Sequence, residues 1–418
     1  MSNVFNIPSE DMFVEQLGRM NSYLHHQNAL LEVMAEESLL QLTENFDEIV
    51  ELQNDGLAEE VLHIGTQINL EWKDVASDTT YVVPHDIVHY GDVMLEDGET
   101  TNGMFLSWHY CTPFGITFDA REAFFAATDA VLPAGTYNVI MGLNWGTHVV
   151  KDKVYQFTTT VDVPVGGVLA GFESAPDVAP TSWKVKVCDA SRTVLETVNV
   201  TEGSAGTNLG TFTAAGEYGG STLNSIQAVA YGLNRDKDSA LRQWLNSEAG
   251  VGAWWSAQHK YDMPPAEAAT KAGFLTGYAP EIRRHFTKTK IRTAQNTVSA
   301  DGSFDEYYDR VFSPSKEQIY NTPSIAGEGE YWEYWKRALG RTSPTGTGSG
   351  NIYPAYKIYA INAKTSAQLV RLRSAYRGTA YGTWYVTSSG YVYSYYTGSG
   401  AYYAYRALPS LVIAQQII

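Results

Sequence analysis

The sequence contains little cysteine, no long apolar run and few basic residues. Cys111 and Cys188 are the only cysteines among 418 residues, which excludes a disulfide scaffold and predicts folding in a reducing cytoplasm. The sequence leaves open whether these two side chains lie near each other. It contains no run of about 18 apolar residues and no apolar segment at the N-terminus, so we expect neither membrane insertion nor secretion by a signal peptide.

Basic residues are outnumbered by acidic ones, and the formal net charge is −17 at pH 7. Nucleic-acid binding requires a basic surface for the phosphates, so this balance argues against a nucleic-acid partner. The sequence also lacks a Gly-x-Ser-x-Gly elbow, a His-Glu-x-x-His helix and a Cys-x-x-Cys pair. We therefore expect no enzyme activity, no cofactor and no metal site. The histidines of the β-rich middle part do not have the spacing of a metal site. They are His85, His89, His109 and His148.

Changes in the spacing of apolar residues divide the chain into three predicted parts with an α+β fold. Residues 1–55 predict a helix with an apolar 4-3 repeat over about three heptads, typical of a coiled coil that joins copies or attaches the protein. Packing of this helix on its own domain is an equal alternative. Residues 56–223 alternate β-branched and polar residues between turns, which predicts a mostly antiparallel β-rich structural domain. Residues 224–418 predict a separate α+β domain.

Local patterns predict individual elements within these parts. One helix is predicted inside the β-rich part, with Asp119 as its N-cap and its end at residue 132. Another is predicted over residues 240–250, with Asp238 or Ser239 as its N-cap. The clearest strands are predicted at residues 80–84, 103–110, 136–143, 154–165 and 182–187.

Charged clusters in the third part allow both structural and functional interpretations. The basic residues between Arg283 and Arg292 can hold a polyanion, but a solvated face neutralised by the acidic surplus is favoured. Asp301, Ser303 and Asp305 have the spacing of a calcium loop without its glycine and distal glutamate. Six acidic residues could supply the carboxylate pair of an enzyme, but acids in such segments usually face water. They are Asp305, Glu306, Asp309, Glu328, Glu330 and Glu333.

The stretch from Tyr376 to Tyr405 has the composition of a binding surface. Of its 30 residues, 26 are Tyr, Ser, Thr, Gly or Ala. Tyrosine provides a large rigid contact area at low rotamer cost, and serine and glycine add adaptable hydrogen bonding. A soluble protein rarely exposes so many contiguous aromatic rings without a partner. The alternative is that these rings pack on one another in a β-rich core.

Alternation within this stretch predicts a sheet with two different faces. Strands are predicted at residues 382–387 and 391–396, joined by a Ser-Ser-Gly turn. Trp384, Val386 and Val392 then share one face, which can be buried. The tyrosines on the opposite face are Tyr385, Tyr391, Tyr393 and Tyr395.

Several motifs occur in the order found in a known family. They are SALRQWLNS at 239–247, GFLTGY at 273–278, TAQNTV at 293–298, DRVFSPSKEQIY at 309–320, LRSA at 372–375 and ALPSLVI at 407–413. With these motifs the chain resembles the C-terminal module of phage and prophage variable proteins, which a diversity-generating retroelement rewrites. Further motifs that resemble prophage structural proteins of Firmicutes are NDGLAEEVLHIG at 54–65, FDAREAFFAATDAVLPAGTY at 118–137 and VPVGGV at 163–168. The family's usual aromatic pair before Leu-Arg-Ser is replaced here by Val370-Arg371.

The resemblance implies a C-type-lectin-like C-terminal domain, residues 224–418, whose diversified surface displays a ligand-binding site. Adenine-directed mutagenesis of Asn-type codons in such proteins yields mainly Tyr, Ser, Thr, Ala and Gly, which are the residues that dominate the stretch. The implied ligand-binding residues are Tyr376, Tyr381, Tyr385, Tyr391, Tyr393, Tyr395, Tyr396, Tyr402, Tyr403 and Tyr405. Weaker members of the set are Thr379, Ser394, Thr397 and Ala401.

The resemblance further implies a virion protein that is assembled in the bacterial cytoplasm and acts as an adhesin on the head or the tail. Its expected partners are a host surface protein or glycan and other virion proteins. The chain is expected to form a homo-oligomer, and a trimer is the commonest arrangement in such proteins. Two alternatives remain open. One is a decoration or assembly protein whose tyrosines contact a neighbouring virion subunit, and the other is an enzyme with the lectin-like fold of formylglycine-generating proteins.

Overall fold

The computed structural model is mostly β-structure in antiparallel sheets, with short helices. No helix in the part that it describes is long and apolar enough to cross a membrane. The predicted coiled-coil repeat lies outside the described residues. These are 46–120, 124–128, 130–141, 150, 152–171, 183–191, 193–212, 226–229, 234–258, 262, 264–297, 300–320, 327–337, 353–354, 357–378, 381–393 and 400–416.

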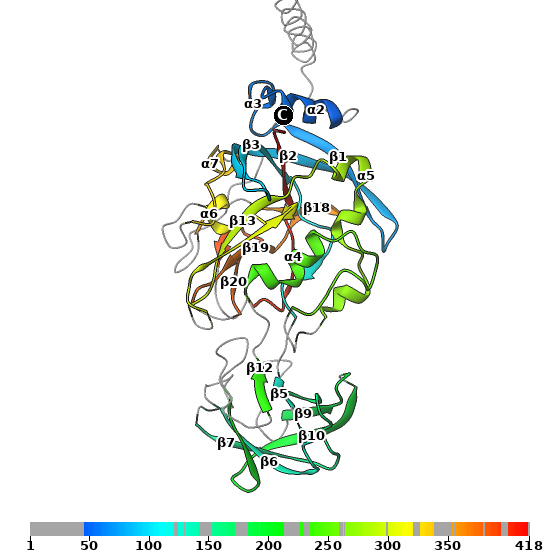
Figure 1. The fold of residues 1–418 in the computed structure, drawn as a ribbon, viewed down its shortest axis with the longest axis vertical. Coiled ribbons are helices and arrows are strands. Elements are labelled where there is room, and N and C mark those ends of the chain that lie inside the picture. The colour runs from blue at the N-terminus through cyan, green and yellow to red at the C-terminus, as the bar shows by residue number, and fades with distance from the viewer. Residues whose placement is uncertain are drawn as a thin grey trace, which may run out of the picture.

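The larger body of the protein is built on two sheets that join distant parts of the chain (Figure 1). A five-stranded antiparallel sheet has the order β1-β2-β3-β23-β15, so β23 from near the C-terminus pairs with β3. A six-stranded sheet has the order β16-β21-β20-β19-β22-β4. The strands of these sheets are β1 (Gln67–Asp74), β2 (Thr79–Met94), β3 (Thr100–Trp108), β4 (Gly115–Thr117), β15 (Val311–Phe312), β16 (Tyr353–Pro354), β19 (Val370–Ala375), β20 (Thr383–Val386), β21 (Tyr391–Tyr393), β22 (Ala404–Arg406) and β23 (Ser410–Ala414).

Both sheets contribute to one hydrophobic core in this larger body. Apolar side chains of β1–β3 and β23 pack there with those of β19–β21. The polar atoms of Trp108, His85 and Tyr278 inside this core are hydrogen-bonded to one another, which offsets the cost of burying them. The indole of Trp108 donates a 2.7 Å hydrogen bond to the hydroxyl of Tyr278, and Nε2 of His85 lies 2.9 Å from the same hydroxyl.

Residues between β4 and residue 234 contribute a second body with a core of its own, seen in the lower part of Figure 1. Its eight-stranded sheet has the order β11-β6-β7-β10-β9-β8-β5-β12 and is antiparallel except for the β11–β6 pair. Val139, Tyr155, Phe157 and Val185 lie in this core. The strands are β5 (Phe124–Thr128), β6 (Gly135–Met141), β7 (Val154–Thr159), β8 (Val168–Gly171), β9 (Trp183–Cys188), β10 (Val194–Glu202), β11 (Thr207–Phe212) and β12 (Ile226–Val229).

The predicted division of the chain at residue 223 does not follow this grouping of strands. β1–β4 share their sheets and their core with the C-terminal part, whereas β5–β12 form the separate sheet. The second body is thus inserted into the chain of the larger one. Alternating strands of both bodies have the same period in the sequence, so periodicity alone does not reveal where an insertion begins.

The strongly alternating segments are confirmed as strands, and one predicted helix is wrong. The five clearest predictions correspond to β2, β3, β6, β7 and β9. The segment after Asp119, predicted to be helical, contains β5, which pairs with β8 on one side and β12 on the other. Alanine and glutamate favour a helix there, but pairing on both edges of the strand outweighs this local preference.

Short helices and hairpins complete the larger body. Ser239 caps α4 by accepting a 3.0 Å hydrogen bond from the amide of Arg242, and the Gln415 side chain donates a 3.0 Å bond to the carbonyl of Asn54 at the end of α2. Both cysteines are buried and form no disulfide, with Cys111 in the larger core and Cys188 on β9. The remaining elements are α2 (Phe46–Asn54), α3 (Ala58–Val61), η2 (Asp236–Asp238), α4 (Ala240–Leu245), η3 (Ala266–Ala269), η4 (Phe274–Gly277), α5 (Pro280–Arg283), β13 (Thr289–Ala294), β14 (Phe304–Asp309), α6 (Lys316–Ile319), α7 (Glu333–Arg337), β17 (Tyr359–Ala360) and β18 (Ala363–Ala367).

Candidate functional site

A row of aromatic side chains crosses the six-stranded sheet. Tyr393 on β21 lies opposite Tyr385 on β20, which in turn lies opposite Arg371 on β19. The ring centroid of Tyr385 lies 5.8 Å from that of Tyr393 and 5.1 Å from that of Tyr405 on β22. Tyr403 continues the row by stacking on Tyr405 at 5.9 Å, with ring planes 8° apart. We call Tyr385, Tyr393, Tyr403 and Tyr405 the tyrosine row.

The alternate residues of the same strands pack into the core. Val386 lies opposite Val392, and both are fully buried together with Trp384. The turn between the two strands places Gly390 at a φ of +83°, where a side chain would be strained. The predicted core face is therefore confirmed for β20 and β21, whereas the predicted open tyrosine face is seen only on β21, because every residue of β20 is buried.

Arg371 is the buried centre of the tyrosine row. Its guanidinium carbon lies 4.3 Å from the ring centroid of Tyr405. Its Nη2 donates hydrogen bonds of 3.0 Å and 2.9 Å to the carbonyls of Gly400 and Tyr403, and its Nη1 donates to the hydroxyl of Thr383. Burial lowers the pKa of Arg371 to about 10, so the side chain remains charged at neutral pH. This one cation fixes the backbone that carries Tyr403.

Sequence reasoning missed this role of Arg371. In β19 the arginines alternate with Val370 and Leu372, a pattern that predicts exposed arginines, yet all six residues of the strand are buried. The hydrogen-bond partners of Arg371 come from residues 383, 400 and 403, which are distant in sequence.

The predicted ligand-binding tyrosines differ in how far they reach solvent. Tyr403 has the largest exposed fraction of those that the structure describes, 38%, whereas Tyr385 has 6%. Tyr385 departs from the expectation, because its ring lies among Tyr393, Tyr405 and Arg371 and supports the row. Burial accordingly raises the pKa of Tyr385 and of Tyr405. The partly exposed members of the predicted set are Tyr376, Tyr381, Tyr391, Tyr393, Tyr402 and Tyr405.

Some predicted positions do not belong to the row. Tyr376 lies apart from it, with its ring edge-to-face against Trp384 at 6.1 Å. Ala401 is fully buried, and its amide donates a 2.7 Å hydrogen bond to the carbonyl of Tyr381. A larger side chain at Ala401 would have to displace core atoms, so this position belongs to the frame. Predicted positions outside the described residues are Thr379, Ser394, Tyr395, Tyr396 and Thr397.

The basic cluster between Arg283 and Arg292 is confirmed as a face neutralised by acids. Every one of its five basic side chains lies within ion-pair distance of an aspartate or a glutamate. Such pairs at the surface contribute little stability and leave little net charge for a polyanion. The pairs are Arg283–Glu248, Arg284–Asp47, Lys288–Glu96, Lys290–Glu306 and Arg292–Glu306.

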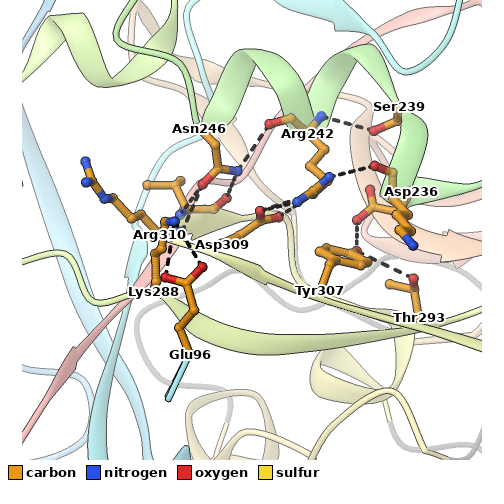
Figure 2. Close-up of polar contacts among 12 residues, drawn as sticks. Glu96, Asp236, Ser239, Arg242, Asn246, Lys288, Thr293, Tyr307, Asp309 and Arg310 are labelled. Atoms are coloured by element: carbon orange, nitrogen blue, oxygen red, sulfur yellow. Dashed lines mark hydrogen bonds and ion pairs between the residues drawn. The ribbon is translucent and has the colours of Figure 1, made fainter. Parts of the chain in front are cut away.

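A buried polar cluster joins η2, α4 and β14 (Figure 2). Arg242 from α4 binds both carboxylate oxygens of Asp309, with 2.8 Å from Nη2 to Oδ1 and 2.8 Å from Nε to Oδ2. The same guanidinium stacks 4.3 Å above the ring of Tyr307, whose hydroxyl donates to Asp236. Asn246 accepts a 2.9 Å hydrogen bond from the amide of Arg310 and so closes the cluster at the end of α4.

Burial controls the protonation of this cluster. It raises the pKa of Asp236 to about 6 and that of Asp309 to about 7, although Tyr307 and Arg242 act in the opposite direction. Asp305 is likewise bound by Arg235, at 2.7 Å from Nη2 to Oδ1. Asp305 and Asp309, which the sequence offered for an enzyme's acid pair and, in the case of Asp305, for a calcium loop, bind Arg235 and Arg242 and so tie β14 to α4 and the residue before η2. Their arrangement explains how the frame is held together.

The other acids of that set divide between the interior and the surface. Glu328 is buried, and its Oε1 accepts a 2.9 Å hydrogen bond from the amide of Ala294 while its Oε2 accepts from the hydroxyl of Ser374. Burial raises the pKa of Glu328 to about 7. At the surface, Glu330 lies 3.2 Å from Nε2 of His89, and Glu333 pairs with lysine and arginine on its own helix.

The histidines that the structure describes occupy separate places. His85 is fully buried, and desolvation lowers its pKa to about 4, so it is neutral. His109 lies 2.9 Å from a carboxylate oxygen of Asp86. Within the described ranges, no group of three or more His, Cys, Asp or Glu is placed to hold a metal ion. His148 lies outside those ranges.

Comparison with known proteins gives one match. A family model described as a domain of unknown function, DUF6273, matches residues 222–411. This range contains the polar cluster, Glu328 and the tyrosine row, and it leaves out the inserted sheet up to β11. No curated protein matches the chain. No solved structure matches it either.

Proposed function

We propose that the tyrosine-bearing sheet is a ligand-binding surface without catalytic activity, and that the chain is a virion adhesin of the phage variable-protein type with a C-type-lectin-like C-terminal domain. The observation that carries this proposal is the separation of the two faces of β20 and β21. One face supplies side chains to the main core, and the other carries tyrosine rings outside that cluster, with Tyr385 buried beneath the partly exposed Tyr393. A surface of this kind can change its side chains while the frame keeps its packing.

The chemistry of the row suits recognition of a protein or a glycan. Each aromatic ring that a ligand fully removes from water contributes about 1.5–3 kcal/mol. Stacking of Tyr403 on Tyr405 holds the exposed ring in a defined orientation, so less side-chain entropy is lost on binding. Tyrosine hydroxyls then supply hydrogen bonds that orient the ligand. Homo-oligomerisation through the coiled coil predicted within residues 1–55 would multiply weak contacts by avidity.

The structure sharpens which positions are expected to vary. Tyr391, Tyr393 and Tyr403 combine a place on or beside the row with contact to solvent, and replacement there leaves the core intact. Arg371 and Trp384 belong to the frame and are expected to stay constant.

Sequencing this locus across a phage population tests the proposal. Amino-acid changes are expected at codons 391, 393 and 403, with the matched core codons 384, 386 and 392 unchanged. A reverse-transcriptase gene and a near-copy of the coding segment for residues 376–405 are expected nearby. If the tyrosine codons vary no more than the core codons and no such gene lies nearby, diversification is contradicted. A decoration or assembly protein is then favoured.

A further inference from the structure

A cavity of about 300 Å³ lies in the larger body, apart from the tyrosine row. Its walls come from β2 and β3 on one side, β13 and β14 on another, and the segment from Gly327 to Trp332. This volume is at the lower end of the range for small-molecule sites in proteins. The residues that line the cavity include Phe105, Phe312, Trp332, Gln318, Arg373 and Lys290.

One wall of the cavity is aromatic. The ring centroid of Trp332 lies 6.0 Å from that of Phe105 and 6.4 Å from that of Phe312. Phe105 is the partly exposed ring of the three, and Phe312 and Trp332 are buried beside it, so a flat or aliphatic group can pack on Phe105 against this aromatic support.

Arg373 provides a buried cation at this aromatic wall. Its side chain is 1% exposed, and its guanidinium carbon lies 5.6 Å from the ring centroid of Phe312. Nη1 donates hydrogen bonds of 3.0 Å to the carbonyl of Ser313 and 2.6 Å to the side-chain oxygen of Gln318, and Nη2 donates to the carbonyl of Glu328. Its Nε has no hydrogen-bond partner among the described residues. A buried donor of this kind is rare in a native protein, and a ligand or water would satisfy it.

Other charged side chains around the cavity are largely engaged with one another. Lys290 and Arg292 both pair with Glu306, and His89 lies 3.2 Å from Glu330. The carboxylate oxygens of Glu328 accept hydrogen bonds from Ala294 and Ser374. Asp92 also lines the cavity. The three hydrogen-bond acceptors of Arg373 are two carbonyls and an amide, so its charge is balanced only through space, by the carboxylates of Glu328, Asp236 and Asp309.

We propose that this cavity binds a small organic carboxylate with an apolar body. The carboxylate binds the Nε–H of Arg373, and the apolar body packs on Phe105, which Phe312 and Trp332 support. Arginine suits this task because it stays charged when buried and its Nε–H has a fixed direction, whereas the lysine ammonium is a point charge that loses its proton more readily when buried. This site is independent of the tyrosine row, so each proposal can fail without the other.

Titration with phenylacetate, followed by calorimetry and by thermal unfolding of the full chain, tests the site. Phenylacetate is expected to bind and to raise the melting temperature. Phenylacetamide, which has the same shape without the charge, is expected to bind about tenfold more weakly. Equal binding of the two compounds, or no binding of either, would overturn the proposal, the latter leaving Arg373 to be satisfied by water.

Three variants link binding to the cavity. Arg373→Lys is expected to weaken phenylacetate binding about tenfold. Phe105→Leu, which shortens the aromatic wall at a partly exposed position, is expected to weaken it about threefold. Lys290→Gln removes a cation that lines the cavity and is expected to weaken binding about twofold, whereas Lys288→Gln, its surface counterpart outside the cavity, is expected to change nothing.

The test of this site does not require that the Arg373→Lys variant folds. If Arg373→Lys fails to fold, the comparison of Lys290→Gln with Lys288→Gln and the effect of Phe105→Leu decide the question. Wild-type affinity in both Lys290→Gln and Phe105→Leu would place phenylacetate elsewhere and overturn the proposal.

Discussion

The two faces of the six-stranded sheet use the same strands for different purposes. On the core face, Trp384, Val386 and Val392 are buried among aliphatic and aromatic neighbours. On the opposite face, tyrosine rings contact one another and a single buried arginine, and Tyr403 reaches water. The difference shows how a sheet can separate what holds it together from what it presents. Stability is expected to follow the core face and Arg371.

The largest effect on stability is expected from Trp384→Ala. This change leaves a cavity in the core and removes the ring that lies 3.8 Å from the ammonium of the buried Lys316. The free energy of unfolding is expected to fall by about 3–5 kcal/mol. Urea denaturation of the variant measures it, and a loss as small as that of a surface substitution would contradict the assignment of this face to the core.

Arg371→Met tests whether the tyrosine face depends on its buried cation. The carbonyls of Gly400 and Tyr403 lose their donor, and a charged stacking partner of Tyr405 disappears. We expect a loss of about 2–3 kcal/mol in the free energy of unfolding. Tyrosine fluorescence or near-ultraviolet circular dichroism is expected to change as well. An unchanged spectrum would show that Arg371 does not order the rings.

Glu328→Gln tests the pH dependence of the frame. The pKa of Glu328 is raised to about 7 in the folded protein from an ordinary value of 4.5, so the folded state binds more protons between these values. Its stabilising contribution is present below about pH 4.5 and lost as the pH rises to about 7. As the pH rises across this range, the free energy of unfolding of the glutamine variant is expected to increase by about 2 kcal/mol relative to that of wild type.

Comparing the variant with wild type cancels the contributions of other buried groups. Asp236 and Asp309 shift stability in the same direction as Glu328, whereas the lowered pKa of His85 acts in the opposite direction. Denaturation at pH 5 and at pH 8 supplies the comparison. A difference between the proteins that does not change with pH would contradict a raised pKa at Glu328.

Local patterns predicted the two-faced sheet well because alternation is a property of neighbouring residues. The strands, the turn at Gly390 and the opposite faces of Val386 and Tyr385 all follow from a period of two. The Ser239 cap and the inward side chains of α4 follow from helical spacing.

Long-range pairing could not be predicted in this way. The place of β23 beside β3 and the insertion of an eight-stranded sheet depend on partners distant in sequence. The strand at β5 has a helix-favouring composition, and only its two neighbouring strands explain it. The contacts of Arg371 and Arg373, residues of the same strand, with different loops belong to this class too.

The free energy of unfolding of the Tyr391→Ser, Tyr393→Ser, Tyr403→Ser triple variant tests the central claim most directly. These side chains are partly exposed or exposed and lie outside the core, so the total loss is expected to be about 1 kcal/mol or less. Binding of the ligand should be abolished in the same protein. A loss equal to that of Trp384→Ala would show that the rings hold the fold together and would contradict their role as a replaceable surface.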